Sequence, residues 1–345
     1  MEVDVLIIGA GNQGLAMAGY LSTEGYSVGI WNRTYDNIAG LQRQSKIYIK
    51  GAIETEASIK IVTSDIEDVN SRLIIVTTPT DSHNDIARLL SQKVLDETII
   101  ILSPGRTFGA LNFKHQLVKY KCKYNPIIVE TQTIIHTARL VNQTTVYIYG
   151  FKHDVLISSI CPSVGWYKFL PNCLRKYYKR VDSYVYTSLG NVGMILHCLP
   201  TLLNIGCIES KDISFKYYID GISPSISRLL ELLDQERLNV AFNLGYNLIS
   251  TKEWLESSYS IKGNDLFDTI QINAAYSELL APNTKFHRYI HEDVPNGLVP
   301  LEYLAHDMGI KCSLTTLTID LANLIMNVDY RKIGRTFRRE ELYNI

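Results

Sequence analysis

The glycine-rich turn GAGNQG, Gly9 to Gly14, constrains the fold of this chain more than any other sequence feature. A predicted buried strand, Val3 to Ile8, precedes the turn, and a helix is predicted directly after it, from about Asn12 to Thr23. A strand, a glycine turn and a helix in this order begin the βαβ unit of dinucleotide-binding folds. The alternative is a glycine turn that binds nothing, within the same kind of α/β protein.

The glycines of such a turn have separate roles. Gly9 permits the tight turn, Gly11 lets the backbone approach a pyrophosphate, and Gly14 allows the helix to pack closely on the strand. Asn12 and Gln13 lie at the start of the helix, where free backbone amides and the helix dipole favour an anion. We therefore predict that these five residues bind the cofactor.

The next predicted strand, Tyr26 to Asn32, ends at the position that distinguishes NAD from NADP. NAD enzymes usually carry Asp or Glu there, which accepts hydrogen bonds from the ribose hydroxyls. This chain instead has Asn32, Arg33 and Thr34. An amide, a guanidinium and a hydroxyl suit a 2′-phosphate, so NADP(H) is favoured over NAD(H). The alternative is that Arg33 stacks on the adenine and accepts either cofactor.

A second predicted contact with the cofactor lies in the segment TTPTDSH, Thr77 to His83. It follows a later strand that ends at the same edge of the sheet. We expect Thr78 and Pro79 to border the nicotinamide ribose. The competing interpretation is an ordinary turn after a strand.

Strand-like and helix-like segments alternate through the first half of the chain. Such alternation predicts right-handed crossovers and a doubly wound parallel sheet, a Rossmann-type α/β domain covered on both faces. A segment with helical spacing, residues 85–92, lies between two apolar runs. The predicted strands after the first two are residues 47–48, 59–62, 73–77, 99–102, 127–129 and 145–149.

From about Val181 the pattern changes to long amphipathic helices. In the clearest one, Ser223 is the predicted N-cap, Pro224 the first helical residue and Gly245 the left-handed end. Further helices are predicted over residues 300–308 and 314–328. The sequence therefore predicts a dinucleotide-binding domain over residues 1–178 and a mostly α-helical substrate and catalytic domain over residues 179–345.

Composition excludes several classes of partner. Of 345 residues, 46% are hydrophobic and 20% charged, with a formal net charge of -1, so no global field attracts nucleic acid or a membrane. No apolar stretch approaches the roughly 18 residues that span a bilayer. The apolar run near the N-terminus is too short for a signal peptide and follows acidic residues. The basic segment Arg331 to Glu340 is interpreted as a solvated helix end, with phosphate binding as the alternative.

Six cysteines are scattered along the chain without a Cys-x-x-Cys pair. This usage favours a reduced, cytoplasmic protein with buried thiols over a disulfide framework or a metal site.

Two segments of the second half could carry acid–base chemistry. His197 lies in the apolar stretch NVGMILHCLP, where the alternative is a core histidine with no chemical role. Arg288, Glu292 and Asp293 crowd into one short polar segment, where the alternative is a charged surface loop. A carboxylate from this segment could orient the imidazole and stabilise its charged form, and an arginine could bind a substrate carboxylate through two hydrogen bonds.

Six motifs in order along the chain resemble the octopine/nopaline dehydrogenase family over nearly its whole length. They are GAGNQG, SPGRTFGAL (Ser103 to Leu111), ETQTIIHTARL (Glu130 to Leu140), NVGMILHCLP (from Asn191), YYIDGISPSISRLLELLDQERL and RYIHEDVPNGLVPLEYLA. The family commonly has proline directly after the histidine, whereas here Cys198 and Leu199 intervene before Pro200.

The resemblance implies a role for each matching residue. His197 would be the catalytic acid/base, Asp293 its carboxylate partner, and Arg288 the group that binds the 2-oxo acid. Asn191 would support the same substrate site. Gln132 and Arg139 are implied as further substrate-binding residues.

The implied reaction condenses an amino acid with a 2-oxo acid, pyruvate by default, and reduces the imine to a secondary-amine dicarboxylate, an opine. One alternative is a simple 2-oxo acid or ketone reductase of the ketopantoate reductase or glycerol-3-phosphate dehydrogenase type, which typically uses a lysine as proton donor. Another is a nicotinamide-sensing protein that reduces nothing. A homodimer is one assembly that the sequence leaves open.

Overall fold

The computed structural model describes residues 1–161 and 165–343, which form two compact units. The first contains Met1–Gly105 and Gly109–Thr187. The second contains Ser188–Ile345 together with three residues from the first half of the chain, Arg106–Phe108. The sequence placed the domain boundary after residue 178, and the structure divides the chain after Thr187.

An eight-stranded sheet forms the centre of the first unit, in the order β12-β11-β8-β7-β6-β1-β2-β5. Neighbouring strands run parallel except β11, which is antiparallel to β8. The four residues of β1, β2, β6 and β7 are all buried, as expected for strands covered on both faces. The strands are β1 Val5–Ile8, β2 Val28–Trp31, β5 Ile61–Thr63, β6 Leu73–Val76, β7 Ile99–Leu102, β8 Ile127–Thr131, β11 Val155–Ser159 and β12 Tyr178–Arg180.

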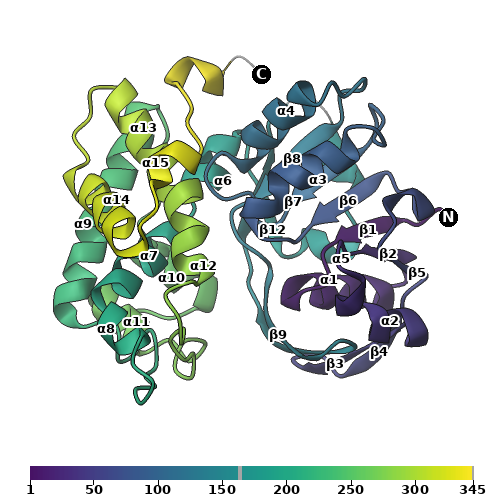
Figure 1. The fold of residues 1–345 in the computed structure, drawn as a ribbon, viewed down its shortest axis with the longest axis horizontal. Helices are drawn as coiled ribbons and strands as arrows, with labels where there is room; N and C mark the ends of the chain where they lie inside the picture. Colours follow the sequence, from purple (N-terminus) through teal and green to yellow (C-terminus); the bar gives the residue numbers. More distant parts are fainter. Residues whose placement is uncertain (162–164, 344–345) are drawn as a thin grey trace. The chain divides into compact units, whose positions relative to one another are not determined.

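The strand order reverses beside β1, which lies between β2 and β6. Because crossovers are right-handed, α1 (Asn12–Thr23) covers one face of the sheet, and α3 (His83–Leu90) and α4 (Gly109–Lys119) cover the other (Figure 1). The predicted Rossmann-type fold is therefore confirmed. Ligands of such sheets bind where the order reverses, beyond the carboxyl ends of β1 and β6.

Two of the predicted strands do not belong to this sheet. The apolar runs 47–48 and 145–149 lie in β3 (Lys46–Gly51) and β10 (Thr145–Phe151), within a separate four-stranded sheet of order β4-β3-β10-β9. Its other strands are β4 (Thr55–Ser58) and β9 (His136–Asn142), and β10 is antiparallel to β9. Placing these runs in the parallel sheet was wrong, because β3 alternates buried and exposed residues, as a strand with one solvent face does.

Helix α1 packs against this small sheet as well as the large one. A Cβ atom on Gly19 would lie 2.8 Å from Ile49 Cδ1, so the glycine allows close contact between helix and β3. Two shorter helices also belong to the first unit, α2 (Ala39–Gln44) and α5 (Asn172–Arg175), and the boundary after Thr187 falls within α6 (Tyr184–Leu189).

The second unit is helical, and α7 (Gly193–Leu203) contacts the long helices α9 (Pro224–Asn243) and α14 (Ser313–Met326) (Figure 1). As predicted, α9 begins at Pro224, with the Ser223 hydroxyl accepting a hydrogen bond from Ile226 N, and Gly245 follows it with φ +91°. The remaining elements are α8 Ile205–Ile208, α9 Pro224–Asn243, α10 Thr251–Tyr259, α11 Leu266–Gln271, α12 Arg288–His291, α13 Val299–Asp307, α14 Ser313–Met326, α15 Tyr330–Ile333 and a π-helical turn η5, Val294–Leu298.

A proline inside α7 is accommodated by a neighbouring tyrosine. Pro200 has no N–H to donate to Leu196 O, the usual acceptor one turn earlier. The Tyr217 hydroxyl lies 3.3 Å from Leu196 O and 2.7 Å from His197 O, in place of the missing donor. The helix therefore continues through the proline, and the backbone of His197 is held from outside the helix.

Buried ionic contacts anchor α9 in the same unit. Arg237 Nε donates to Asp234 Oδ1 at 2.8 Å, and its other nitrogens donate to Leu189 O and Ile249 O. Asp234 also accepts from the backbone and hydroxyl of Thr251. None of the helices in residues 1–161 and 165–343 has the length and apolar character needed to cross a membrane.

Candidate active site

The glycine turn has the geometry of a nucleotide-binding turn. Gly9 has φ +107°, a conformation that L side chains rarely adopt. A Cβ atom on Gly14 would lie 1.8 Å from Gly9 O, so only glycine lets α1 pack this closely on the turn. A Cβ atom on Gly11 would meet no atom within 4 Å, so the backbone there faces open space.

The side chains of Asn12 and Gln13 bind to strand β9. Asn12 Oδ1 accepts from Leu140 N at 2.8 Å, and Gln13 Oε1 lies 2.7 Å from His136 Nδ1. Burial, helped by the charge of Lys152, lowers the pKa of His136 to about 3, so the ring is neutral and donates to Gln13. A contact of these two residues with a cofactor would therefore come from their backbone amides.

The end of β2 supports the glycine turn and presents a cation. Asn32 Oδ1 accepts from Ala10 N at 3.1 Å, which fixes the turn, and its Nδ2 donates to Thr34 O. Arg33 Nη1 lies 3.2 Å from Asp85 Oδ2, and both side chains are more than half exposed. The Arg33 guanidinium is therefore available to an anionic ligand, with Asp85 as its competitor.

The predicted segment after β6 lies beside the same turn. The backbone N–H of Thr77 donates to Ile8 O at 2.9 Å, and a Cβ atom on Gly9 would lie 2.8 Å from Thr78 Cγ2. Pro79 follows and is exposed. Strands β1 and β6 are neighbours, so Thr78 and Pro79 lie at the point where the strand order reverses.

In the helical unit, His197 of α7 pairs with Asp293, which precedes the π-helical turn η5. His197 Nδ1 lies 2.7 Å from Asp293 Oδ2, with 11% of the His197 side chain exposed and none of the Asp293 side chain. The ring of His197 also stacks on Tyr289, with centroids 3.9 Å apart. A carboxylate at Nδ1 selects the tautomer whose other nitrogen, Nε2, can exchange a proton with a substrate.

The pKa of His197 lies below its usual value of 6.5. Burial is the largest cause, and the positive charges of Arg288 and Arg106 act in the same direction. The Asp293 carboxylate opposes them by stabilising the charged ring. His197 is therefore neutral at pH 7 and becomes a stronger base when a neighbouring cation is neutralised.

Arg288 is placed to bind an anion near this pair. Its Nη1 lies 3.3 Å from Glu292 Oε2, one helical turn away, and 45% of its side chain is exposed. The guanidinium also lies over the Tyr289 ring, 5.3 Å from its centroid. The part of the guanidinium fork that Glu292 does not use is open to a carboxylate.

Arg106 belongs to the same cluster, although the sequence did not single it out. Its Nη2 lies 3.1 Å from Glu292 Oε2 and its Nη1 lies 3.4 Å from Asp293 Oδ1, with only 9% of the side chain exposed. Burial acts to lower the pKa of this guanidinium, but the Asp293 and Glu292 carboxylates outweigh it and hold the pKa above its usual value. The segment SPGRTFGAL marked only a family resemblance, because nothing in it shows that Arg106 reaches residues nearly 190 positions away.

Asn191, two residues before the first residue of α7, completes the cluster. Its Oδ1 accepts from Arg106 Nη1 at 3.3 Å, and its Nδ2 donates to Thr107 Oγ1 at 3.3 Å. The structure therefore brings together four of the predicted residues, His197, Asn191, Arg288 and Asp293.

The other two predicted substrate residues belong to the first unit. Gln132 is buried directly after β8, and its backbone N–H donates to Leu156 O at 2.9 Å. Arg139 is exposed on β9, opposite Tyr147 of β10.

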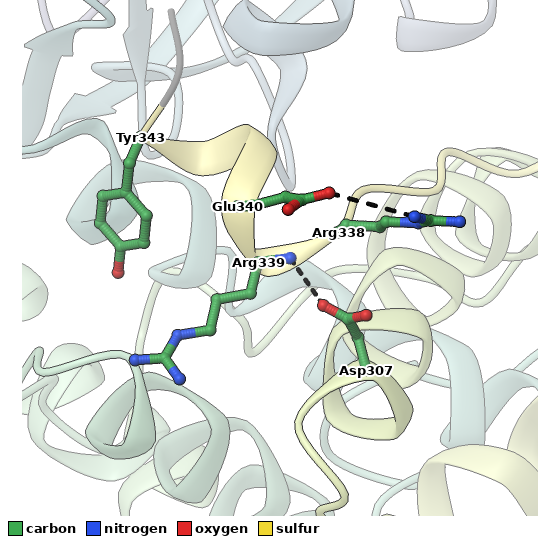
Figure 2. Close-up of a pocket in the computed structure, with 5 residues that line it drawn as sticks. All are labelled: Asp307, Arg338, Arg339, Glu340 and Tyr343. Carbon is green, nitrogen blue, oxygen red and sulfur yellow. Dashed lines mark hydrogen bonds and ion pairs between the residues drawn. The ribbon is translucent and has the colours of Figure 1, made fainter.

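A separate hollow on the helical unit involves the basic C-terminal segment. It is lined by Asp307, Arg338, Arg339, Glu340 and Tyr343 (Figure 2). The backbone N–H of Arg339 donates to Asp307 Oδ2 at 2.8 Å, and Arg338 faces Glu340. The first contact joins the segment to the last residue of α13, the second lies within the segment, and none of the lining residues is a predicted catalytic, substrate-binding or cofactor-binding residue.

Two protein families match successive parts of the chain. The N-terminal domain of NAD-dependent glycerol-3-phosphate dehydrogenase matches residues 4–130, and the α-helical domain of NAD/NADP octopine/nopaline dehydrogenase matches residues 180–326. Together with the fold, these matches define the class of protein: a nicotinamide-dependent oxidoreductase with a Rossmann-type domain followed by an octopine dehydrogenase-type helical domain.

Similarity to known proteins extends over almost the whole chain. An opine dehydrogenase of Arthrobacter sp. (strain 1C) is 32% identical over 96% of this chain and 93% of its own. A structure of octopine dehydrogenase with NADH and agmatine has a TM-score of 0.80 at 17% identity, covering 99% of this chain and 96% of the other. An octopine dehydrogenase structure with NADH and pyruvate (TM-score 0.76, 17% identity, 99% and 95% covered) and yersinopine dehydrogenase with NADP+ (0.76, 15%, 97% and 93%) share the fold.

The chain belongs to the octopine/nopaline dehydrogenase family, as the resemblance of its motifs predicted. It is an NAD(P)-dependent oxidoreductase of the opine dehydrogenase type, acting on the CH–NH group of its donors.

Proposed function

We propose that this enzyme uses NADPH to condense an amino acid reductively with a 2-oxo acid, pyruvate in the first instance, into a secondary-amine dicarboxylate. The observation that supports this most is the buried His197–Asp293 pair, 2.7 Å apart, with a half-exposed arginine four residues from Glu292 beside it. A proton donor and a carboxylate-binding cation are the two groups that such a condensation needs.

In the proposed reaction Arg288 binds the carboxylate of the 2-oxo acid and so orients its carbonyl group. The amine of the amino acid attacks this carbonyl, and His197 protonates the oxygen that leaves as water, which produces an imine. A nicotinamide cofactor held at the Gly9–Gly14 turn would supply the hydride for the imine carbon. His197 then exchanges a proton with the amine nitrogen of the product, while Asp293 holds the imidazole ring in one tautomer.

In this scheme, binding of the 2-oxo acid raises the pKa of His197 and so promotes its protonation. The free site contains two arginines, Arg106 and Arg288, and two carboxylates, Glu292 and Asp293, so His197 is the group that can adjust its charge. When a substrate carboxylate neutralises Arg288, one of the causes that lower the pKa of His197 is removed. The ring then takes up the proton that the leaving oxygen requires.

The preference for NADP(H) is supported by Arg33 and Thr34, both exposed after β2, because the three residues that follow this strand, Asn32 to Thr34, include no Asp or Glu. Among proteins with this fold, octopine dehydrogenase has been solved with NADH and yersinopine dehydrogenase with NADP+. Gly9, Gly11 and Gly14 would hold the pyrophosphate together with the amides of Asn12 and Gln13.

The amino-acid substrate would contact further residues. We assign Asn191 to support of the 2-oxo acid site, because it holds Arg106 within the cluster. Gln132 and Arg139 are proposed for the amino acid on family resemblance alone. We also propose a cytoplasmic location, since all six cysteines are free thiols. A homodimer is the simplest assembly, because two-fold dimers are the commonest soluble oligomers, and light scattering tests it.

The test is an NADPH-oxidation assay with pyruvate, run with and without a panel of amino acids, with products identified by mass. Oxidation that requires both substrates, with a product mass equal to their condensation and reduction, supports the proposal. Oxidation by pyruvate alone, giving a hydroxy acid, identifies a simple 2-oxo acid reductase instead. A matched His197→Ala variant should bind NADPH normally and lose turnover by orders of magnitude, and unchanged turnover would refute the assignment.

A further inference from the structure

We propose that Arg106 is a positioning residue of this active site: it turns Asp293 toward His197 and tunes the proton affinity of the histidine. The inference rests on the proposed function, because it concerns the acid that the function assigns. It adds a residue that lies far from the histidine motif in sequence and would not itself touch the reacting atoms.

The contacts of Arg106 account for both carboxylates of the cluster. Asp293 has two oxygens: Oδ2 lies 2.7 Å from His197 Nδ1, and Oδ1 lies 3.4 Å from Arg106 Nη1. The guanidinium therefore occupies one side of the carboxylate and leaves the other for the imidazole. Its second amino group, Nη2, lies 3.1 Å from Glu292 Oε2, which also accepts from Arg288.

The electrostatic need for a buried cation is clear. Glu292 and Asp293 are adjacent in sequence, and both side chains are at most 7% exposed. Two buried carboxylates on adjacent residues repel each other unless a cation lies beside both of them. Arg106 contacts both, whereas the half-exposed Arg288 contacts only Glu292. The Asp293 carboxylate in turn stabilises the charged form of His197.

The loop that carries Arg106 is built to hold it in place. Arg106 and Phe108 have φ of +62° and +54°, a left-handed conformation that is unfavourable for residues with a side chain. Hydrogen bonds to the residue between them maintain it: Thr107 N donates to Asn296 O, and Arg335 Nη1 donates to Thr107 O. The backbone N–H and C=O of Thr107 are thus both hydrogen-bonded, which fixes the backbone next to Arg106.

Helix α7 leaves room for the Arg106 guanidinium because its first residue is a glycine. A Cβ atom on Gly193, the first residue of α7, would lie 2.5 Å from Arg106 Nη1. The conflict is with the far end of a flexible side chain, so an alanine there would displace the guanidinium without disrupting the backbone. Gly193→Ala therefore moves Arg106 while leaving every charged side chain present.

The effect on pH has a defined sign. His197 faces Asp293, Arg106 and Arg288, with Tyr289 stacked on its ring and Cys198 next to it on the helix. Arg106 lowers the pKa of His197, so removal of its charge raises that pKa. Because reduction needs protonated His197, the alkaline fall of kcat in Arg106→Met should move to higher pH. Loss of the hold on Asp293 should at the same time lower kcat.

The experiment compares Arg106→Met, Arg106→Lys and Gly193→Ala with wild type in steady-state assays over pH 5 to 10. We expect Arg106→Met to lower kcat by about 10²-fold or more, as expected for loss of a group that orients an acid–base pair, with the KM for NADPH unchanged. Arg106→Lys keeps the positive charge, so it should recover part of kcat. Its alkaline fall of kcat, the alkaline limb of the pH profile, should stay near the wild-type pH. Gly193→Ala should give a smaller fall and a smaller upward shift.

Two matched controls separate positioning from folding. Arg237→Lys alters another buried, paired arginine of the helical unit, and Gly206→Ala adds a methyl group where no atom lies within 4 Å. Both should leave the pH limb in place, even if Arg237→Lys lowers thermal stability. A limb for Arg106→Met that stays at the wild-type pH or moves below it overturns the inference. If His197→Ala retains full activity, it is the proposed function that fails.

Discussion

The imidazole of His197 lies parallel to the phenol ring of Tyr289, with 3.9 Å between centroids and 14° between planes. The ring is therefore held on one face by stacking and at Nδ1 by Asp293. These two contacts fix the direction of Nε2 before any substrate arrives, which favours proton transfer in one geometry.

Removing the stacked ring should loosen the histidine. We predict that Tyr289→Leu lowers kcat roughly tenfold, since aromatic pairs contribute about 0.5–1.5 kcal/mol beyond burial. It should also raise the KM for the 2-oxo acid, because Arg288 lies over the same ring. Tyr289→Phe keeps the ring and is the control. Equal losses in both variants, measured by steady-state kinetics, would show that the hydroxyl group matters and the stacking does not.

Asp293→Asn should preserve the size of the side chain and remove its function. The amide nitrogen can donate to Nδ1, which favours the opposite tautomer, so kcat should fall by roughly 10³–10⁴-fold, as in other His–Asp pairs. Binding of NADPH, measured by fluorescence titration, should stay within about twofold. A fall in kcat of less than tenfold would contradict the assigned role of Asp293.

Binding of the 2-oxo acid should be accompanied by proton uptake. Arg288 is one of the cations that lower the pKa of His197, and a bound carboxylate neutralises it. Isothermal titration of pyruvate into the enzyme–NADPH complex without amino acid, in two buffers of different ionisation enthalpy, measures the uptake. The signal should disappear in His197→Gln. No uptake by the wild-type enzyme at pH 7 would exclude this coupling.

Arg33 should affect one cofactor and not the other. A charge-assisted hydrogen bond to a 2′-phosphate contributes about 1.5–3 kcal/mol, so Arg33→Ser should raise the KM for NADPH by roughly 10- to 100-fold and leave that for NADH nearly unchanged. Asp85→Asn removes the competing carboxylate 3.2 Å away and should lower the KM for NADPH. Parallel changes for both cofactors in either variant would argue for adenine stacking instead.

Stability should fall in mild acid because of His136. Its pKa is about 3 in the folded protein and about 6.5 when unfolded. Between these values the unfolded state binds more protons, so stability is full above pH 6.5 and declines as pH falls. From pH 6.5 to 5 the loss is about 2 kcal/mol. Urea unfolding at both pH values tests this, and His136→Asn should show a flatter dependence.

Local patterns were sufficient for elements whose determinants are adjacent in sequence. A helix from about Asn12 to Thr23 and a capped start of α9 at Ser223 were predicted, and the structure has both. Each depends on a glycine, a proline or a hydroxyl next to the element it bounds. Membership of β3 and β10 in a second sheet depends on pairing between strands about 95 residues apart, which an apolar run of two to five residues does not specify.

The site divides in the same way. His197 and Asp293 stood out because each lies in a family motif, and the structure joins them. Arg106 did not, since its partners are Asn191, which precedes α7, and two carboxylates before η5, and an arginine in a glycine-containing loop has no local signal of burial. Nor did the sequence reveal that Asn12 and Gln13 would use their side chains on β9.

The placement of Arg106–Phe108 within the second unit bears on how chimeric enzymes of this family should be built. A hybrid joined near residue 180, with a nucleotide half from one relative and a helical half from another, would take Arg106 and its partners Glu292 and Asp293 from different parents. The cofactor preference of such a hybrid would come from one parent. Its His197–Asp293 pair would come from the other parent and would lack the arginine loop that it contacts there. Transferring residues Arg106–Phe108 together with the helical half would keep the contacts around His197 and Asp293 unchanged.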